Sequence, residues 1–231
     1  MEVKRGVLYG VGVGPGDPEL MTVRACRVLA ACPVIACPRT RQGHMLALEI
    51  AGAAASLAGK ELLPLDFAMT RDPAARQACY DRAAEALVSR LAAGRDIALL
   101  TLGDVSVYST FAYLAAPAAA RGYAVEPIPG VASFSAAAAR LGLSLTEMDK
   151  PLRILPAGME GLEQELDRPG TKVLMKAGSA APRTLALLKE RGLLQKTALV
   201  TDCGLPGERV FPDLTEPPED MGYFSIFIVK E

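Results

Sequence analysis

The densest run of unusual residues is Gly10-Val-Gly-Val-Gly-Pro-Gly-Asp17, which holds four glycines and a proline and follows an apolar segment. Its position is that of a dinucleotide-binding turn, but the GxGxxG spacing fails because Pro15 and Asp17 stand where a glycine is required. No Gly-Lys-Ser/Thr follows, so a Walker loop is excluded. Glycines permit a tight turn, yet four exceed what a turn needs. We therefore expect close backbone approach by a ligand that is not a phosphate.

Two further motifs of this kind include the ends of later apolar segments, at residues 100–110 and 128–136. In the first, Gly103 gives clearance and Asp104 can accept a hydrogen bond from an amine or a hydroxyl. Taken alone, each turn is also explained as the start of a helix, with a serine or Asp104 as its N-cap. Three such turns in this order form a specific pattern, because ligands bind beyond the carboxyl ends of parallel strands.

The elements around these turns alternate short apolar runs with longer amphipathic or alanine-rich segments, the pattern of an α/β protein. The expected strands span residues 7–11, 34–37, 61–65, 96–102, 124–128, 152–155, 172–176, 197–201 and 224–229. The expected helices span residues 19–31, 45–56, 74–93, 107–120, 134–141 and 182–191. Asp17 is the predicted N-cap of the first helix, with Pro18 at its first position.

Regular strand–helix repeats end near Gly122, which predicts two domains, residues 1–122 and residues 123–231. The second has more closely spaced strands and a β-rich end over residues 208–214 and 223–229, so we expect a mixed sheet with some antiparallel pairing. Both domains are expected to be α/β.

Composition excludes several classes of protein. The chain has 231 residues, is 51% hydrophobic and 22% charged, and has a formal net charge of -1. Disorder is excluded, and a near-neutral chain has no global reason to coat nucleic acid or an anionic membrane. No apolar run reaches the ~18 residues of a membrane-spanning helix, and the N-terminal run lacks a signal-peptide cleavage site. Five cysteines without a CxxC pair indicate reduced thiols in the cytoplasm. With a single histidine, we expect no protein-bound metal.

The chain resembles the tetrapyrrole (corrin/porphyrin) methylases, which use S-adenosylmethionine. The resemblance covers nearly the whole chain, from residues 11–25 to residues 223–230. Leu102-Gly-Asp in place of Gly-Gly-Asp argues against the uroporphyrinogen methylases, and Val105 departs from the family's usual proline. The segments most similar to the branch that methylates C-20 of precorrin-2 or cobalt-factor II, in cobalamin (vitamin B12) biosynthesis, are residues 100–114, 128–145, 151–157 and 171–178.

This resemblance implies a methyl donor bound in a cleft between the two domains, held largely by backbone groups. It also implies a homodimer and a tetrapyrrole substrate with many carboxylates. The positions that match the family's donor contacts are Pro15, Leu102, Gly103, Asp104, Val107, Ala132, Ser133, Gly204 and either Met175 or Lys176.

A polycarboxylate substrate is expected to be bound by basic side chains. Arg39, Arg41 and His44 form the best cluster, in the loop after the second expected strand, with Lys150 and Arg153 behind them. An ordinary solvated loop also explains the two arginines, and a helix cap explains His44 equally well.

The aromatic residues after the second turn, Tyr108, Phe111 and Tyr113, are candidates for contacting the macrocycle, and core packing explains them equally well. Methyl transfer from a sulfonium requires orientation of two partners rather than an enzyme nucleophile. The base that removes the proton from the methylated carbon is not identified by the sequence. A carboxylate, Tyr108 and water all remain open.

Three other interpretations compete. A sibling enzyme of the same pathway, methylating another carbon, would share the donor turns. A nucleotide-binding α/β protein is argued against by the failed fingerprint in the first turn. A non-catalytic interaction module would not bind the donor at all.

Overall fold

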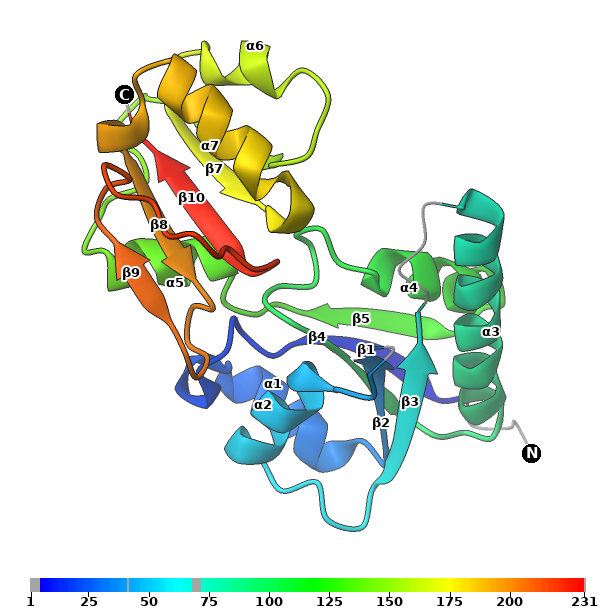
Figure 1. Ribbon diagram of the computed structural model, residues 1–231. Coiled ribbons are helices and arrows are strands. Elements are labelled where there is room, and N and C mark those ends of the chain that lie inside the picture. The colour runs from blue at the N-terminus through cyan, green and yellow to red at the C-terminus, as the bar shows by residue number, and fades with distance from the viewer. Residues whose placement is uncertain (1–4, 41, 68–71, 231) are drawn as a thin grey trace. The chain divides into compact units, whose positions relative to one another are not determined.

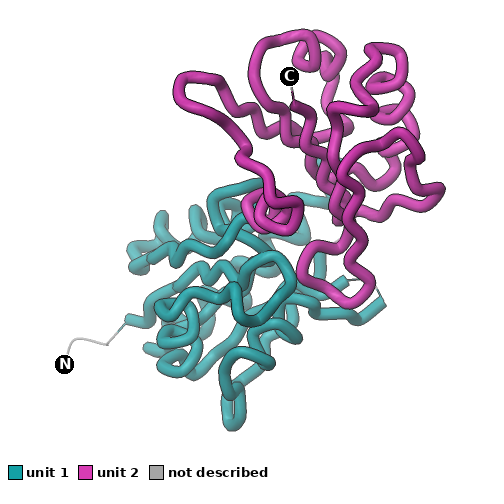
Figure 2. The backbone as a smooth tube through the Cα atoms, turned by 90° about the vertical axis from the view of Figure 1, so that its left-hand side faces the viewer, with its two compact units in different colours: residues 1–132 teal, residues 133–231 magenta. Residues whose placement is uncertain are grey.

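The structure is a computed structural model in which the described residues are 5–40, 42–67 and 72–230. It contains two compact units, one running to Ala132 and the other starting at Ser133 (Figure 2). Within the described residues, each unit has its own five-stranded sheet. The predicted division after residue 122 is too early, because β5 (Ala124–Ile128) pairs in parallel with β1 (Val7–Gly12) and so belongs to the first unit.

The sheet of the first unit is parallel, with strand order β3-β2-β4-β1-β5 (Figure 1). Its other strands are β2 (Val34–Arg39), β3 (Glu61–Asp66) and β4 (Ile97–Thr101). Its helices are η1 (Pro18–Leu20), α1 (Val23–Ala31), α2 (Leu46–Ala54), α3 (Pro73–Ala92) and α4 (Phe111–Ala120).

Helices cover both faces of this sheet. Leu87 of α3 and Leu114 of α4 are fully buried against strand residues such as Leu99. Helices α1 and α2 lie on the opposite face (Figure 1), where they bury Leu29 and Ile50. Each such side chain contributes about 1.5–3 kcal/mol when it leaves water. This two-sided core fixes the strands and therefore the turns at their ends.

The connections after β1 and β4 leave the sheet in opposite directions. From β1 the chain moves to β2 on one side, whereas from β4 it moves to β5 on the other side. In open parallel sheets, ligands bind beyond the carboxyl ends of strands at such a switch point. The first two predicted turns follow these two strands, and the third follows β5.

The second unit has a mixed sheet, as predicted, with strand order β6-β7-β10-β8-β9. Strands β6 and β7 are parallel, β10 is antiparallel to both β7 and β8, and β9 is antiparallel to β8. The strands are β6 (Leu152–Pro156), β7 (Thr171–Met175), β8 (Thr197–Thr201), β9 (Arg209–Phe211) and β10 (Ser225–Val229). The helices are α5 (Ser133–Arg140), α6 (Leu162–Leu166), η2 (Gly178–Ala180), α7 (Ala181–Glu190) and η3 (Leu194–Lys196).

The first predicted helix is partly wrong. Asp17 caps only the short η1, where its side chain accepts from the backbone N–H of Glu19 at 2.9 Å. Helix α1 begins later and is capped by Thr22, whose Oγ1 accepts from the N–H of Ala25 at 3.1 Å. A second capping residue five positions downstream therefore divides the predicted helix in two.

None of the helices in the described part of the chain is both long and apolar enough to cross a membrane. All five cysteines are free thiols. Burial raises the pKa of Cys32 and of Cys37 to about 12 and that of Cys203 to about 11. These three thiols are therefore protonated at neutral pH and pack as small apolar side chains.

Candidate functional site

The turns after β1 and β4 are joined by backbone hydrogen bonds. Val13 N–H donates to Thr101 O at 2.9 Å. Gly14 and Gly103 form an isolated antiparallel bridge, with N–H···O distances of 3.2 Å and 2.7 Å. Both glycines have positive φ, +78° and +74°, a conformation that L side chains rarely adopt. These bonds fix the first two turns relative to each other.

The third turn packs directly on the first two. A Cβ on Gly12 would lie 2.7 Å from Gly130 N and 2.8 Å from Gly103 O, and a Cβ on Gly130 would lie 2.2 Å from Gly103 O. The space beside the α-carbons of Gly12 and Gly130 is therefore occupied by the backbone of the neighbouring turns. The expectation that the extra glycines of the first turn admit a ligand is therefore wrong for Gly12, which is needed for packing between turns.

The carboxylate of Asp104 links the second turn to the third. Its Oδ2 accepts from Gly130 N–H at 2.8 Å, and its Oδ1 accepts from Ser106 N–H at 2.8 Å and from the Ser106 hydroxyl. Burial opposes ionisation, but hydrogen bonds from Ser106, Gly130 and Val105 outweigh it and hold the pKa of Asp104 below its usual value. The carboxylate is therefore ionised at neutral pH and is held in place by backbone and hydroxyl donors.

Neither Asp104 nor Ser106 caps helix α4, so the simplest explanation of this turn does not hold. The N-cap is Thr110, and the hydroxyl of Ser109 accepts from Phe111 N–H at 2.9 Å. Phe111 itself is buried and its ring lies over Gly10, where a Cβ would come within 2.4 Å of it. Phe111 is therefore a core residue.

Tyr108 has an unusual backbone, with φ at +50° in the left-handed region. For a bulky residue this conformation costs about 1–3 kcal/mol and tends to occur at functional sites. Its side chain is 41% exposed. Partial burial raises the pKa of the phenol, so Tyr108 is neutral at physiological pH and suits hydrogen bonding better than proton removal.

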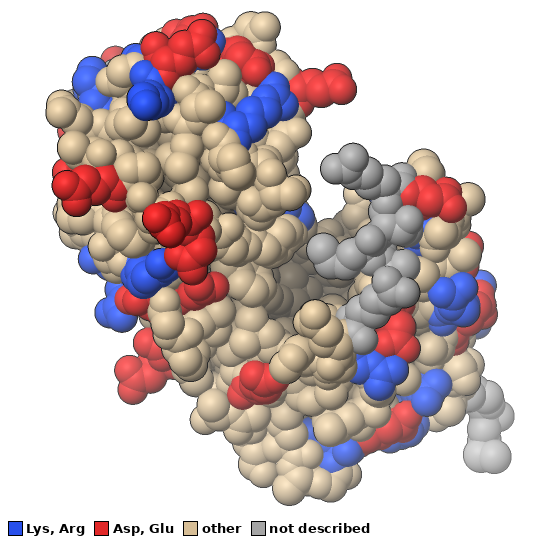
Figure 3. All heavy atoms as spheres, in the orientation of Figure 1, with Lys and Arg blue, Asp and Glu red and all other residues tan. Residues whose placement is uncertain are grey.

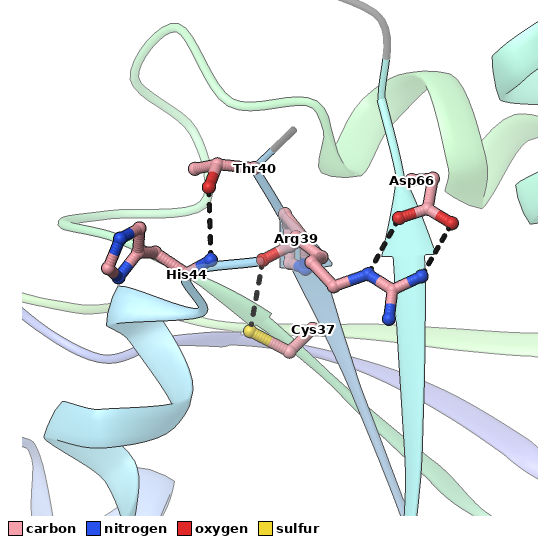
Figure 4. Close-up of polar contacts among 6 residues, drawn as sticks. Cys37, Arg39, Thr40, His44 and Asp66 are labelled. Atoms are coloured by element: carbon pink, nitrogen blue, oxygen red, sulfur yellow. Dashed lines mark hydrogen bonds and ion pairs between the residues drawn. The ribbon is translucent and has the colours of Figure 1, made fainter. Parts of the chain in front are cut away.

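Arg39 ends β2 and forms a two-point ion pair with Asp66, its register partner at the end of β3 (Figure 4). Arg39 Nε donates to Asp66 Oδ1 at 2.7 Å, and Nη2 donates to Oδ2 at 2.8 Å. The pair lowers the pKa of Asp66 and raises that of Arg39. Nη1 makes no hydrogen bond within the described residues. Asp66 was not anticipated, because its role depends on which strand lies beside β2.

His44 lies in the same loop but does not join Arg39 in one cluster. Its imidazole points away from the Arg39 guanidinium (Figure 4). Its backbone N–H donates to Thr40 Oγ1 at 3.1 Å, and its carbonyl accepts from Thr40 N–H at 2.9 Å. The third predicted member, Arg41, lies outside the described residues. Lys150 and Arg153 belong to the second unit, where they pair with Glu147 and Glu165 respectively.

The remaining predicted donor positions fall in both units. Leu102, Val107 and Ala132 are half-buried in the first unit, whereas Pro15 is buried. Ser133 is the first residue of helix α5 in the second unit.

Lys176 and Gly204 follow β7 and β8 in the second unit. These strands run in the same direction because both are antiparallel to β10, so both positions lie at one edge of that sheet. Lys176, directly after β7, and Asp202, directly after β8, have positive φ, at +57° and +51°. Partial loss of water contact lowers the pKa of Lys176. Gly204 N–H donates to Glu208 Oε2 at 2.6 Å. Sequence reasoning did not single out Asp202, since left-handed backbone at a non-glycine residue has no sequence signature.

Charges are interspersed on the face shown in Figure 3, where neither sign forms one large block. Many are neutralised locally, as in the pairs Arg24–Glu126 and Arg121–Glu85. Among the described residues, no three His, Cys, Asp or Glu side chains gather in a group that could hold a metal ion. In the first unit, the candidate site therefore consists of the three backbone turns, the carboxylate of Asp104, the side chain of Tyr108 and the ion pair between Arg39 and Asp66.

Known proteins are similar in sequence to this chain along nearly its whole length. A cobalt-precorrin-2 C(20)-methyltransferase of Salmonella typhimurium is 33% identical over 98% of this chain and 97% of its own. A probable cobalt-precorrin-2 C(20)-methyltransferase of Methanocaldococcus jannaschii is 35% identical over 96% of this chain and 95% of its own. A precorrin-2 C(20)-methyltransferase of a Sinorhizobium species is 33% identical over 97% of this chain and 95% of its own.

Solved structures share the fold. A cobalt precorrin-4 methyltransferase superposes with a TM-score of 0.78 at 19% identity, covering 97% of this chain and 94% of that chain. A second structure is a Thermus thermophilus uroporphyrin-III C-methyltransferase complexed with S-adenosylhomocysteine. It superposes with a TM-score of 0.65 at 23% identity, covering 98% of this chain and 92% of that chain. The model of the Tetrapyrrole (Corrin/Porphyrin) Methylases matches residues 7–217. The chain therefore belongs to the tetrapyrrole methylase family, and it is a methyltransferase.

Proposed function

We propose that this enzyme transfers a methyl group from S-adenosylmethionine to C-20 of precorrin-2 or of its cobalt-bearing form, in cobalamin biosynthesis. The observation that carries the proposal is full-length similarity to relatives named for that reaction, at 33–35% identity. A relative named precorrin-4 C(11)-methyltransferase is 35% identical, but over 60% of this chain and 49% of its own. Sequence similarity to the C-20 relatives extends along nearly the whole chain, whereas sequence similarity to this sibling enzyme covers part of it.

The turns of the first unit suit a donor bound mainly through backbone groups. Leu102, Val107 and Ala132 are half-buried, so they can contact an apolar part of a ligand and still be reached from solvent. The ionised carboxylate of Asp104 is a hydrogen-bond acceptor of the kind that an amine or hydroxyl group of the donor requires. Pro15, Ser133, Lys176 and Gly204 stay predicted donor contacts.

S-adenosylmethionine supplies an activated methyl group on a sulfonium, so the chain's own residues need only hold and orient the reactants. The bond between the methyl carbon and sulfur breaks as the methyl carbon bonds to C-20, which leaves S-adenosylhomocysteine. C-20 then loses its proton. Tyr108 is a poor candidate for taking that proton, because its phenol pKa is raised. Its phenol can instead donate a hydrogen bond to a carboxylate or carbonyl oxygen of the substrate.

For substrate carboxylates, we propose Arg39 as the main cation of the described loop. A guanidinium with Nε and Nη2 held by Asp66 still presents Nη1, and Arg–carboxylate hydrogen bonds are strong when water is excluded. His44 and Arg41 remain secondary candidates, and no protein-bound metal is needed for the chemistry.

We further propose a cytoplasmic homodimer. Five free cysteines suit a reducing compartment. Exposed apolar side chains such as Val23, Leu62 and Val210 offer surface for a second copy. Light scattering at micromolar concentration is expected to give twice the 24.3 kDa mass of one chain, and a monomer contradicts this part of the proposal.

The test of the function is mass spectrometry of the product after incubation with S-adenosylmethionine and either precorrin-2 or its cobalt form. The proposal expects the mass gain of one methyl group on at least one of the two, and comparison of the rates identifies the true substrate. No methylation of either overturns it.

A further inference from the structure

Three aromatic residues form a continuous run in the first unit. The rings of Tyr80 and Tyr113 are stacked, with centroids 5.0 Å apart and planes 2° from parallel. The ring of Phe67 lies 5.7 Å from that of Tyr80 and is tilted by 56°. We call these three residues the aromatic run.

The aromatic run lies at the carboxyl edge of the parallel sheet. Phe67 directly follows β3, Tyr80 begins the third turn of α3, and Tyr113 is in the first turn of α4. Helices that follow parallel strands begin at the carboxyl edge of the sheet. The aromatic run is therefore on the same edge as the three turns of the candidate site, where ligands bind in folds of this kind.

A cation lies at the same edge of the sheet as the aromatic run. Asp66, which precedes Phe67 in the chain, holds Arg39 through two hydrogen bonds of 2.7 Å and 2.8 Å. Side chains alternate between the two faces along β3, and Phe67 packs against the same core as Leu63 and Leu65. Arg39 and the aromatic run therefore share the carboxyl edge of the sheet but reach it from opposite faces. The Nη1 group of Arg39 makes no hydrogen bond within the described part of the chain, so it can still bind an anion.

Core packing explains two of the three rings. Phe67 and Tyr80 are half-buried and pack against the core formed by α3, α4 and the strands. Tyr113 lies outside them and is 60% exposed, so its ring adds little to that core. An exposed ring stacked on a half-buried one presents a flat, rigid face that favours a second π system over an aliphatic chain.

We propose that the aromatic run is the surface on which a pyrrole ring of the substrate stacks, with Arg39 binding a carboxylate at the edge of the macrocycle. The inference rests on the proposed function, and it adds the aromatic residues that select a macrocycle over other polycarboxylates. Stacking supplies attraction for the π face, and the guanidinium supplies a charge-assisted bond to the carboxylate. A ligand with carboxylates alone can use only the second of these.

The test is a titration of the full-length protein with uroporphyrin III, followed by its absorbance, and in parallel with citrate as a carboxylate without rings. Tyr113→Leu removes the ring and keeps apolar bulk, whereas Tyr113→Phe keeps the ring. Tyr123→Leu is the matched control, because Tyr123 precedes β5 and so lies at the opposite edge of the same sheet. Tyr113→Leu is expected to weaken uroporphyrin binding about three- to tenfold, the usual range for one aromatic pair. Tyr113→Phe and Tyr123→Leu are expected to bind it as wild type does, and citrate binding is expected not to change.

Unchanged uroporphyrin affinity in Tyr113→Leu overturns the inference. So does a change confined to the oligomeric mass of that variant, which would assign Tyr113 to contact with a second copy of the chain. Two further measurements separate these failures from failure of the proposed function. If the wild type methylates precorrin-2 while Tyr113→Leu binds uroporphyrin normally, the inference alone is wrong. If the wild type neither methylates precorrin-2 nor binds S-adenosylhomocysteine, the function itself is wrong.

Discussion

The carboxylate of Asp104 accepts a hydrogen bond from the backbone N–H of Gly130 at 2.8 Å, across 26 positions of the chain. This bond joins the turn after β4 to the turn after β5. Because Gly103 is in turn bonded to Gly14, Asp104 completes a connection among all three turns. The residue predicted to contact the ligand is thus also the residue that holds the site in shape.

Asp104→Ala is expected to destabilise the protein by about 1–2 kcal/mol, because Gly130 N–H and Ser106 N–H lose their acceptor. It is also expected to weaken S-adenosylhomocysteine binding by about tenfold, equivalent to about 1.4 kcal/mol. Urea unfolding and calorimetry measure the two effects. The matched control is Asp213→Ala, since Asp213 accepts the same local bond from the N–H two residues on but, among the described residues, accepts none from a second turn. If the two variants lose the same stability and the same donor affinity, the hydrogen bond from Gly130 N–H to Asp104 contributes to neither.

The pH dependence of stability follows from the lowered pKa of Asp104, whose ordinary value is 3.8. A carboxyl group with a lower pKa in the folded state stabilises the fold above its unfolded pKa, and this stabilisation is lost as the pH falls through the folded pKa. The difference in unfolding free energy between wild type and Asp104→Asn should therefore be constant near neutral pH and shrink below about pH 4. A difference that grows on acidification contradicts the assigned hydrogen bonds.

Two glycine substitutions should act in opposite directions. Gly130→Ala places a Cβ 2.2 Å from Gly103 O, so the turns must separate, and we expect both stability and donor binding to fall. Gly52→Ala, inside helix α2, meets no atom closer than 3.7 Å. It should raise stability by about 0.5–1 kcal/mol, because alanine loses less backbone entropy on folding. Thermal unfolding separates the two, and a stable Gly130→Ala protein with normal donor affinity would show that the turns are not closely packed.

Arg39→Ala should weaken the binding of a carboxylate-rich tetrapyrrole while sparing the donor. The loss should shrink at high salt, because a half-exposed ion pair is screened. The double substitution with Arg41→Ala tests the predicted basic loop as a whole. Asp66→Asn is the control, since it frees Arg39 without removing its charge. Absorbance titration with uroporphyrin at two salt concentrations measures the effect. Wild-type affinity in the double variant would show that this loop is solvated surface and does not bind the tetrapyrrole.

The strands were largely predictable because buried parallel strands are short apolar runs bounded by glycine, proline or charge. Residues 124–128 and 197–201 were predicted with the bounds that the structure gives them. Helix α6 escaped prediction because Leu162–Leu166 is too short for a helical period to stand out. The domain boundary was placed early because nothing local shows that β5 pairs with β1.

The site was predictable where it consists of turns and obscure where it depends on distant contacts. Gly103 and Asp104 stand out by type and spacing. Asp66 did not, because only the pairing of β2 with β3 brings it to Arg39. The stack of Tyr80 on Tyr113 likewise depends on two helices that the sequence separates by a strand.

The central claim is that this chain methylates C-20. Its most direct test is to incubate the protein with precorrin-2 or the cobalt form and S-adenosylmethionine carrying carbon-13 in its methyl group, then to locate the label in the product by nuclear magnetic resonance. The account predicts one labelled methyl group, attached at C-20. A label at C-11 or at any other carbon, or no label in the product, would contradict it.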